Sequence, residues 1–268
     1  MSERRLTVSG ITFDFGNTLV RVDRAGFGVV LDTTATRLRT RGAIDDAAAF
    51  LAEWAVERDR QFRLQVPRLQ EVDLHERFVH VLARLRGAHV PRDDEELWDE
   101  VDAAARSDPE EVDWAVHVYS DAFVAAMAPL PDAEPTLDEA HRRGFRLGVI
   151  SNWPYAPTID RYVEEHGWAG YLRAVVVSQR VGVVKPHPAI FGAAAEQLAV
   201  APGRLLHVGD DWAADVVGGH DAGWRVAYLR GHQGDTPLPT SSRDGTVTPD
   251  LELDRLAELP ALVELAAP

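Results

Sequence analysis

Two patterns of apolar and polar positions follow one another along the chain. Residues 6–14 form an apolar, β-rich run, which predicts a buried strand that ends at Asp14. In residues 20–128 the apolar positions instead recur three and four residues apart, as they do on one face of a helix. The clearest of these faces predicts a helix over residues 74–85. Its apolar positions are Leu74, Phe78, Val81, Leu82 and Leu85.

Further helices are expected in the same stretch, because weaker faces of the same period occur there. One would bury Leu51, Trp54, Ala55 and Phe62. Another would bury Leu97, Val101, Ala104 and Ala105. A turn and a helix start are predicted at Ser107, Asp108 and Pro109. The arginines and histidines of this stretch are interpreted as solvent-exposed side chains; the histidines include His75, His80 and His89.

From Pro129 onward, short apolar strands alternate with helices. Strands are expected at residues 145–150, 174–177, 205–208, 225–229 and 251–253. Helices are expected at residues 136–143, 159–165, 188–198 and 213–222, with a short last helix that ends at Leu262. Residues 232–248 are rich in Gly, Thr, Ser, Pro and Asp and predict a loop. This alternation predicts a parallel sheet with helices on both faces.

The fold class that these patterns predict is α/β, with a Rossmann-like parallel sheet as its core. The helical stretch separates the first strand from the rest of its sheet, so the economical arrangement is one core with an insertion. We therefore expect residues 1–19 and 129–268 to form the α/β core, and residues 20–128 to form an inserted helical domain.

The composition of the chain excludes several classes of partner and of catalytic chemistry. The chain has 268 residues, 46% of them hydrophobic and 26% charged, as in an ordinary soluble globular protein. Its net charge of −15 argues against a partner with a phosphate backbone, which needs a basic face. The absence of cysteine excludes disulfides, thiolate catalysis and cysteine-zinc sites. Without an apolar signal core or a run of transmembrane length, we expect a cytoplasmic protein with no membrane partner, either a monomer or a homodimer.

Polar residues stand where the expected core strands end. Because parallel strands share one edge at their carboxyl ends, these side chains can converge there. Carboxylates suit Mg²⁺, an Asp beside that metal can act as a nucleophile, and a hydroxyl and a lysine can hold phosphoryl oxygens. Each residue alone also has a structural explanation as a cap or a surface residue. The residues at strand ends are Asp14, Ser151, Asn152, Asp210 and Asp211; Lys185 (the chain's one lysine) follows in the loop after the strand expected at 174–177, and Asp215 lies one turn into the helix after Asp211.

Four stretches resemble the four motifs of the haloacid dehalogenase superfamily, in the same order. They are Asp14-Phe-Gly-Asn-Thr-Leu, Val149-Ile-Ser-Asn, Lys185-Pro-His-Pro-Ala-Ile-Phe, and Val208-Gly-Asp-Asp followed, after three intervening residues, by Asp215. The helical stretch after the first motif resembles the helical cap domain of that superfamily. The resemblance covers nearly the whole chain and implies a Mg²⁺-dependent hydrolase that acts on a small phosphorylated metabolite.

The resemblance also implies a role for each motif residue. Asp14 would attack phosphorus and form an aspartyl-phosphate. Ser151, with Asn152 alongside, would bind a phosphoryl oxygen, and Lys185 would stabilise the charge on Asp14 and on the phosphoryl group. The cap would close over the site and select the substrate. Asp215 would ligate the metal or orient its water and Lys185, so the implied Mg²⁺ ligands are Asp14, the carbonyl of Gly16, Asp210 and Asp215.

One position departs from the superfamily's phosphatases. They usually carry a second Asp two positions after the nucleophile, where this chain has Gly16. That Asp protonates the leaving group, and loss of such an acid costs about 10²–10⁴ in rate. A phosphatase that takes a good leaving group, or receives its proton from elsewhere, is therefore one interpretation.

Two alternatives to that interpretation remain. One is a metal-independent 2-haloacid dehalogenase, since halide leaves without a proton. The other is a weakly catalytic or non-catalytic binding protein. Phosphonate hydrolysis through a lysine of the cap is excluded, because residues 20–128 contain no lysine. Three residues near the motifs, Arg21, Arg24 and Trp153, are candidates for contact with substrate or for the solvated surface.

Overall fold

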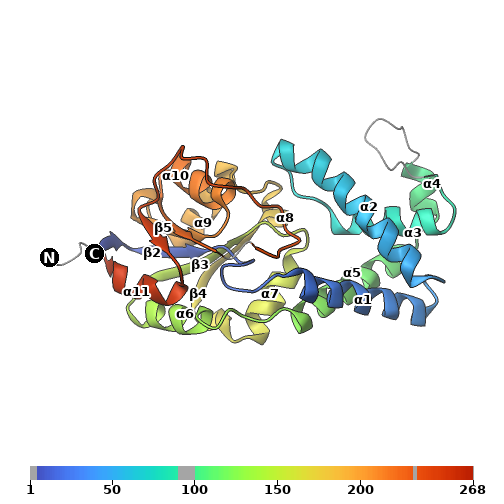
Figure 1. Ribbon diagram of the computed structural model, residues 1–268, viewed down its shortest axis with the longest axis horizontal. Coiled ribbons are helices and arrows are strands. Elements are labelled where there is room, and N and C mark those ends of the chain that lie inside the picture. Colours follow the sequence, from blue (N-terminus) through green and yellow to red (C-terminus); the bar gives the residue numbers. More distant parts are fainter. Residues whose placement is uncertain (1–4, 90–99, 232–233, 268) are drawn as a thin grey trace. The chain divides into compact units, whose positions relative to one another are not determined.

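The computed structural model describes residues 5–89, 100–231 and 234–267 of the chain (Figure 1). It divides the chain into two compact units. One comprises Met1–Arg24 and Met127–Pro268, and the other comprises Ala25–Ala126. In the described part of the chain, no helix combines the length and the apolar character needed to cross a membrane.

The first unit is built on a parallel sheet, as the sequence predicts. Among the described residues its strand order is β4-β3-β2-β5-β6-β7. The strands are β2 (Gly10–Phe13), β3 (Arg146–Ser151), β4 (Leu172–Val177), β5 (Leu205–Gly209), β6 (Arg225–Leu229) and β7 (Leu251–Leu253). Phe13 at the end of β2 lies in register with Val149 of β3 and Val208 of β5. The carboxyl ends of these three strands are therefore neighbours.

The prediction of one strand over residues 6–14 is wrong in one respect, because this stretch forms two strands. β1 (Leu6–Val8) pairs with β8 (Val263–Leu265), a strand that the sequence did not predict, while β2 enters the main sheet. The division falls at Ser9, and at the next residue, Gly10, a Cβ would lie 2.8 Å from Leu205 Cδ2 and 3.1 Å from the Arg146 carbonyl oxygen. The chain passes its neighbours too closely there for a side chain.

Helices cover both faces of this sheet. Figure 1 shows α9 and α10 on one side of the strands and α6 and α7 on the other. The helices are α6 (Ala133–Arg142), α7 (Ala156–Glu165), α8 (Ser178–Val181), α9 (Pro188–Leu198), α10 (Gly218–Asp221) and α11 (Leu259–Leu262). The helix expected over residues 213–222 is instead a π-helical segment, η4 (Trp212–Val217), that continues into α10. Phe191 of α9 packs with Ile150 and Val176 in a buried cluster beneath that helix.

The second unit contains helices, and the expected helix over residues 74–85 is confirmed to the residue. The elements are α1 (Arg24–Arg41), α2 (Ala47–Gln65), α3 (Leu74–Leu85), α4 (Glu100–Ala105) and α5 (Pro109–Ala126). The Asp73 carboxylate caps α3 by accepting the backbone N–H groups of His75 and Glu76. Trp54 lies at the centre of its core, with ring centroids 5.0 Å from Phe78 and 5.2 Å from Tyr119. That this unit acts as a cap stays a prediction.

The buried faces of α2 and α4 were predicted incorrectly. In α2, Trp54 is buried as expected, but Ala55 is exposed and the side chains of Phe50, Glu57, Arg60 and Gln61 are buried instead. In α4, Ala103 is buried, whereas Val101 is 76% exposed. Ala104 and Ala105 are also exposed, and Leu97 lies outside the described residues.

The interpretation of the histidines in this unit as solvent-exposed is wrong for His80, which is 1% exposed. Its Nδ1 lies 2.8 Å from Oε1 of the fully buried Glu57. Glu57 also accepts hydrogen bonds from Arg60 at 3.2 Å and from Arg84 at 2.6 Å. Charged groups become tolerable in a protein interior when they are paired in this way, and a pattern of apolar spacing does not detect such pairs.

Candidate active site

The sheet brings residues from three motifs to one edge. Asp14 directly follows β2, and its backbone N–H donates to the Val208 carbonyl at 2.8 Å. Ser151 is the last residue of β3, and Asp210 directly follows the last residue of β5. Because β2 lies between β3 and β5, the three side chains start from adjacent strand ends. This edge is where open parallel sheets bind their ligands.

Lys185 joins the first and the last of the four motifs. Its ammonium donates to Asp14 Oδ1 at 2.5 Å and to Asp215 Oδ1 at 2.6 Å, and its side chain is 2% exposed. Asn152 fixes the main chain at this residue from both sides. Its Nδ2 donates to the Lys185 carbonyl at 3.1 Å, and its Oδ1 accepts the Lys185 N–H at 2.7 Å. Asn152 therefore orients Lys185, a contact that the sequence did not reveal.

Three carboxylates gather around this ammonium. One oxygen from each of Asp14, Asp210 and Asp215 lies within 4.8 Å of the others. Burial raises the pKa of Asp14 to about 7, with Lys185 opposing the shift and Asp215 adding to it. Burial and the neighbouring carboxylates Asp14 and Asp215 also raise the pKa of Asp210. Burial alone would raise the pKa of Asp215, but Lys185 and His207 hold it below its usual range.

These carboxylates suit a hard divalent cation. Burial raises the pKa values of Asp14 and Asp210, nearby ionised carboxylates add to both shifts, and a bound cation would stabilise the ionised forms. Carboxylate oxygens are the donors that Mg²⁺ prefers. The residues present therefore fit the ion that the sequence implies.

His207 in β5 is a residue of the site that sequence reasoning missed. Its side chain is fully buried, with Nε2 3.1 Å from Asp215 Oδ1 and Nδ1 2.9 Å from Thr12 Oγ1. Burial lowers the pKa of His207, so the ring is neutral and carries one proton. That proton belongs on Nε2, since only a donor there satisfies Asp215, and Nδ1 then accepts from the Thr12 hydroxyl. A histidine inside the apolar run 205–208 was the available signal.

The motifs also supply two buried hydroxyls, those of Thr18 and Ser151. Thr18 donates to Asp210 Oδ1 at 3.2 Å and so steadies that carboxylate. Ser151 is 2% exposed, and its hydroxyl makes no hydrogen bond to any described residue. The Ser151 hydroxyl is therefore available to a ligand at the strand edge.

Asp211 does not belong to the carboxylate group, although the sequence placed it there. Its Oδ1 accepts the Ala214 N–H at 2.8 Å and caps the segment η4. Its carboxylate also accepts the Ser241 N–H at 2.6 Å and the Ser241 hydroxyl at 2.7 Å. Asp211 therefore anchors residues 234–248, which form neither helix nor strand and are here called the 234–248 loop.

The 234–248 loop crosses close to Gly16. A Cβ built on Gly16 would lie 2.9 Å from Leu238 Cδ1 and 3.7 Å from Val22 Cγ2. Next to it, Asn17 adopts a left-handed conformation with φ of 57°, and its N–H donates to the Val20 carbonyl at 2.7 Å. The space in which a side chain at position 16 would project thus holds an apolar group.

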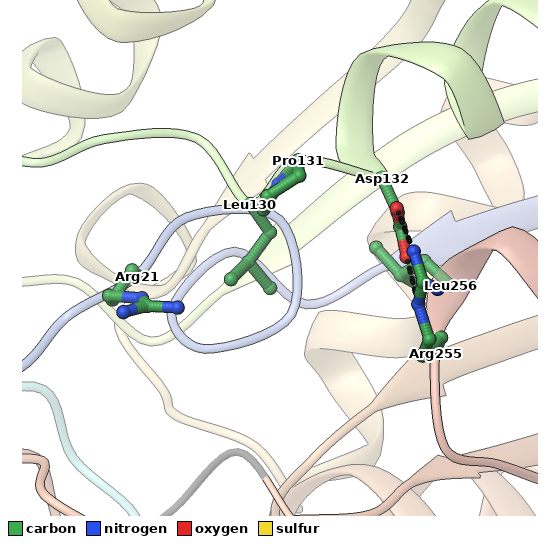
Figure 2. A pocket seen from close by; sticks show the side chains of 6 residues that line it. All are labelled: Arg21, Leu130, Pro131, Asp132, Arg255 and Leu256. Carbon is green, nitrogen blue, oxygen red and sulfur yellow. Dashed lines mark hydrogen bonds and ion pairs between the residues drawn. The ribbon is translucent and has the colours of Figure 1, made fainter.

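The three residues noted near the motifs have separate surroundings. Arg24 contacts Asp235 of the loop, with Nε 3.6 Å from its carboxylate. Trp153 is 4% exposed, and its N–H donates to the Ser178 hydroxyl. Arg21 lines a cavity of about 150 Å³ (Figure 2). None of the residues lining this cavity belongs to the carboxylate site; the others are Leu130, Pro131, Asp132, Arg255 and Leu256, with Arg255 paired to Asp132.

The chain is similar in sequence to several phosphatases. It is 33% identical to the glyceraldehyde 3-phosphate phosphatase of Methanopyrus kandleri over 155 residues, which are 58% of this chain and 65% of that protein. It is 34% identical to the phosphoserine phosphatase of Thermus thermophilus over 131 residues, which are 48% of this chain and 49% of that protein. The chain thus spans about half to two thirds of the length of these relatives.

Solved structures share the fold over almost the entire chain. A 2-haloacid dehalogenase from Pseudomonas syringae superposes with a TM-score of 0.68 at 21% identity, covering 96% of this chain and 98% of that one. A phosphatase from Thermococcus onnurineus gives a TM-score of 0.57 at 21% identity, covering 94% of this chain and 95% of that one. Residues 8–223 match the family described as haloacid dehalogenase-like hydrolases. The chain therefore belongs to the haloacid dehalogenase-like hydrolase family, as the order of its four motifs predicts.

Proposed function

We propose that this hydrolase is a Mg²⁺-dependent phosphatase that acts on a small phosphorylated metabolite through an aspartyl-phosphate on Asp14. The observation that carries the proposal is the arrangement of Asp14, Lys185 and the two further carboxylates at the strand edge. The phosphatase names of its relatives support the same reaction class.

In the first step, a carboxylate oxygen of Asp14 forms a bond to phosphorus while the bond from phosphorus to the leaving oxygen breaks. Lys185 stabilises the charge on Asp14 and on the phosphoryl oxygens, since its ammonium already lies 2.5 Å from Asp14. Ser151 donates its unused hydroxyl to a phosphoryl oxygen. Asn152 contributes by holding the main chain of Lys185.

The metal would be held by Asp14, the Gly16 carbonyl, Asp210 and Asp215. When bound, Mg²⁺ neutralises phosphoryl charge that the single ammonium cannot balance. Asp215 has a second task, because its Oδ1 also accepts from Lys185 and from His207. Loss of Asp215 would therefore displace Lys185 as well as weaken metal binding.

We further propose that residues 20–128 form the cap of this enzyme and residues 1–19 with 129–268 its catalytic core. A helical unit inserted after Asp14 is connected to the core on the carboxyl side of β2, next to the nucleophile. Such a unit can exclude water from the site and select the substrate.

The test is release of inorganic phosphate from a panel of phosphate esters and acyl phosphates, measured with and without Mg²⁺. The variant Asp14→Asn, checked for an unchanged circular dichroism spectrum, serves as the blank. We expect Mg²⁺-dependent release that the blank loses, because an amide is a poor nucleophile. Release that persists in Asp14→Asn would contradict the nucleophile assignment.

A 2-haloacid dehalogenase is a second candidate, favoured by one observation. Position 16 has no acid and is covered by Leu238, and halide leaves as an anion without a proton. The clustered carboxylates oppose this candidate, since they favour a cation that halide displacement does not need. Halide release from 2-chloropropionate without Mg²⁺, together with no phosphate release from the panel, would establish it in place of the phosphatase.

A further inference from the structure

The 234–248 loop is held to the α/β unit by contacts toward both of its ends. On one side, the Asp235 carbonyl accepts the Arg24 N–H at 3.0 Å, and its carboxylate pairs with the Arg24 guanidinium. On the other, Ser241 binds Asp211 through its N–H and its hydroxyl. Asp244 adds a bond from Trp212 Nε1 at 2.7 Å. The loop is therefore a fixed part of the α/β unit.

Leu238 lies between these fastenings and reaches the position next to Gly16. Its N–H donates to the Thr236 hydroxyl at 3.2 Å, which closes a local turn. Its Cδ1 occupies the space into which a side chain at position 16 would extend, 2.9 Å from the Cβ position. Gly16 stands two residues after the nucleophile, the position at which the superfamily's phosphatases usually carry the Asp that protonates the leaving group. The chain thus presents a methyl group there and lacks an acid.

We infer that the leaving group departs without a proton from the protein, and that the substrate is an acyl phosphate, the mixed anhydride of a carboxylic acid and phosphoric acid. This inference rests on the proposed phosphatase function. An ester leaves as an alkoxide, a strong base that needs a proton in the transition state. A carboxylate is a weak base and leaves as the anion.

The bonds and charges balance without an acid. Asp14 forms its bond to phosphorus, the bond from phosphorus to the acyl oxygen breaks, and the electron pair stays on the released carboxylate. Water then attacks the aspartyl-phosphate, Asp14 leaves in its turn as a carboxylate, and the proton of water passes to solvent or to the phosphate product. No oxidant, reductant or further reactant is required.

The experiment measures kcat/KM with Mg²⁺ for acetyl phosphate, for aryl phosphates of rising phenol pKa, and for glycerol 1-phosphate. We expect kcat/KM to fall steeply as the leaving group becomes more basic, with acetyl phosphate about 10²–10⁴-fold above glycerol 1-phosphate, the range of a missing general acid. A flat series would mean that a proton reaches the leaving group from elsewhere, and would overturn the inference while the phosphatase function stands.

A double variant and a matched single variant test the role of Leu238. Gly16→Asp with Leu238→Ala supplies an acid and removes the side chain that a Cβ would meet, so the dependence on leaving-group basicity should flatten. Leu238→Ala alone supplies no acid and should keep the steep dependence; a flattened series in this variant would contradict the inference. Absence of phosphate release from every compound would instead remove the phosphatase function, and the inference with it.

Discussion

At the scale of single residues, the positive charge of Lys185 offsets the repulsion between the ionised carboxylates of the site. Its buried ammonium contacts Asp14 and Asp215 at 2.5 and 2.6 Å, and burial alone would lower its pKa. The two carboxylates outweigh that effect and hold the pKa of Lys185 above its usual range, so the group stays charged. The one positive charge of Lys185 therefore contacts both the nucleophile Asp14 and the carboxylate of Asp215.

Replacing Lys185 by arginine should impair the enzyme although the charge is kept. The guanidinium is larger and planar, so it cannot occupy the ammonium position between the two carboxylates. A displacement of about 1 Å at such a site lowers kcat on the order of 10²-fold, and steady-state kinetics on the best phosphate substrate would measure it.

The control for Lys185→Arg is Arg180→Lys, which alters an exposed ion pair with Asp160. Its kcat should match that of the unmodified protein, since exposed pairs contribute little. A Lys185→Arg variant with the same kcat as this control would show that the ammonium does not act in the reaction.

The placement of candidate site residues was predictable only where a motif marked them. Asp14, Ser151 and Asp210 stand at strand ends, and polar residues after apolar runs are visible in a sequence. The contact of Asn152 with the Lys185 main chain is not visible, because it depends on how two loops meet in space.

At the scale of elements, apolar spacing predicted strands and helices that form locally. β6 and α9 were predicted to the residue, since each is a continuous apolar run or face with clear ends. The pairing of β1 with β8 was not predicted, because it joins residues that lie more than two hundred positions apart in the sequence. The 234–248 loop has no periodic pattern, so its course is fixed by individual anchors such as Asp211 and Ser241.

Removing one of these anchors should loosen the loop measurably. In Ser241→Ala the hydroxyl that donates to Asp211 and accepts the Ala213 N–H is lost. Hydrogen bonds to a charged group are worth about 1.5–3 kcal/mol each, so we expect a loss of about 2 kcal/mol in the free energy of unfolding by urea. Cleavage of the loop by an added protease should become faster.

Ser242→Ala is the matched control, because Ser242 is exposed and makes no hydrogen bond to any described residue. Its unfolding and its cleavage should remain unchanged. If Ser241→Ala unfolded at the same urea concentration as Ser242→Ala, the anchoring role of Ser241 would be wrong.

At the scale of the whole molecule, the carboxylate site should make stability depend jointly on pH and on metal. The pKa of Asp14 is about 7 in the folded protein against 3.8 as the ordinary value. Between these values the folded state holds a proton that the unfolded state has released, so the contribution of Asp14 to stability falls as pH rises toward 7. Above pH 7 the ionised carboxylates repel one another, and a cation relieves that repulsion.

We therefore expect Mg²⁺ to raise the melting temperature more at about pH 8 than at about pH 5.5, where protons compete for the same oxygens. A concentration of a hundred times Kd adds about 2.7 kcal/mol, or roughly 5–10 °C for a chain of this size. Calorimetry at both pH values would measure the shift, and Asp210→Asn should reduce it. Equal shifts at the two pH values would contradict the coupling.

The sheet has a consequence for how the protein is made. β2 lies at its centre, yet its neighbours β3 and β5 begin only at Arg146 and Leu205. A ribosome that adds about 5–20 residues per second leaves this apolar strand without its first partner, β3, for roughly 7 seconds or more. The nascent chain must keep Ile11 and Phe13 from aggregating during that time, so its yield in cells should be more sensitive to chaperone supply than its folded stability suggests.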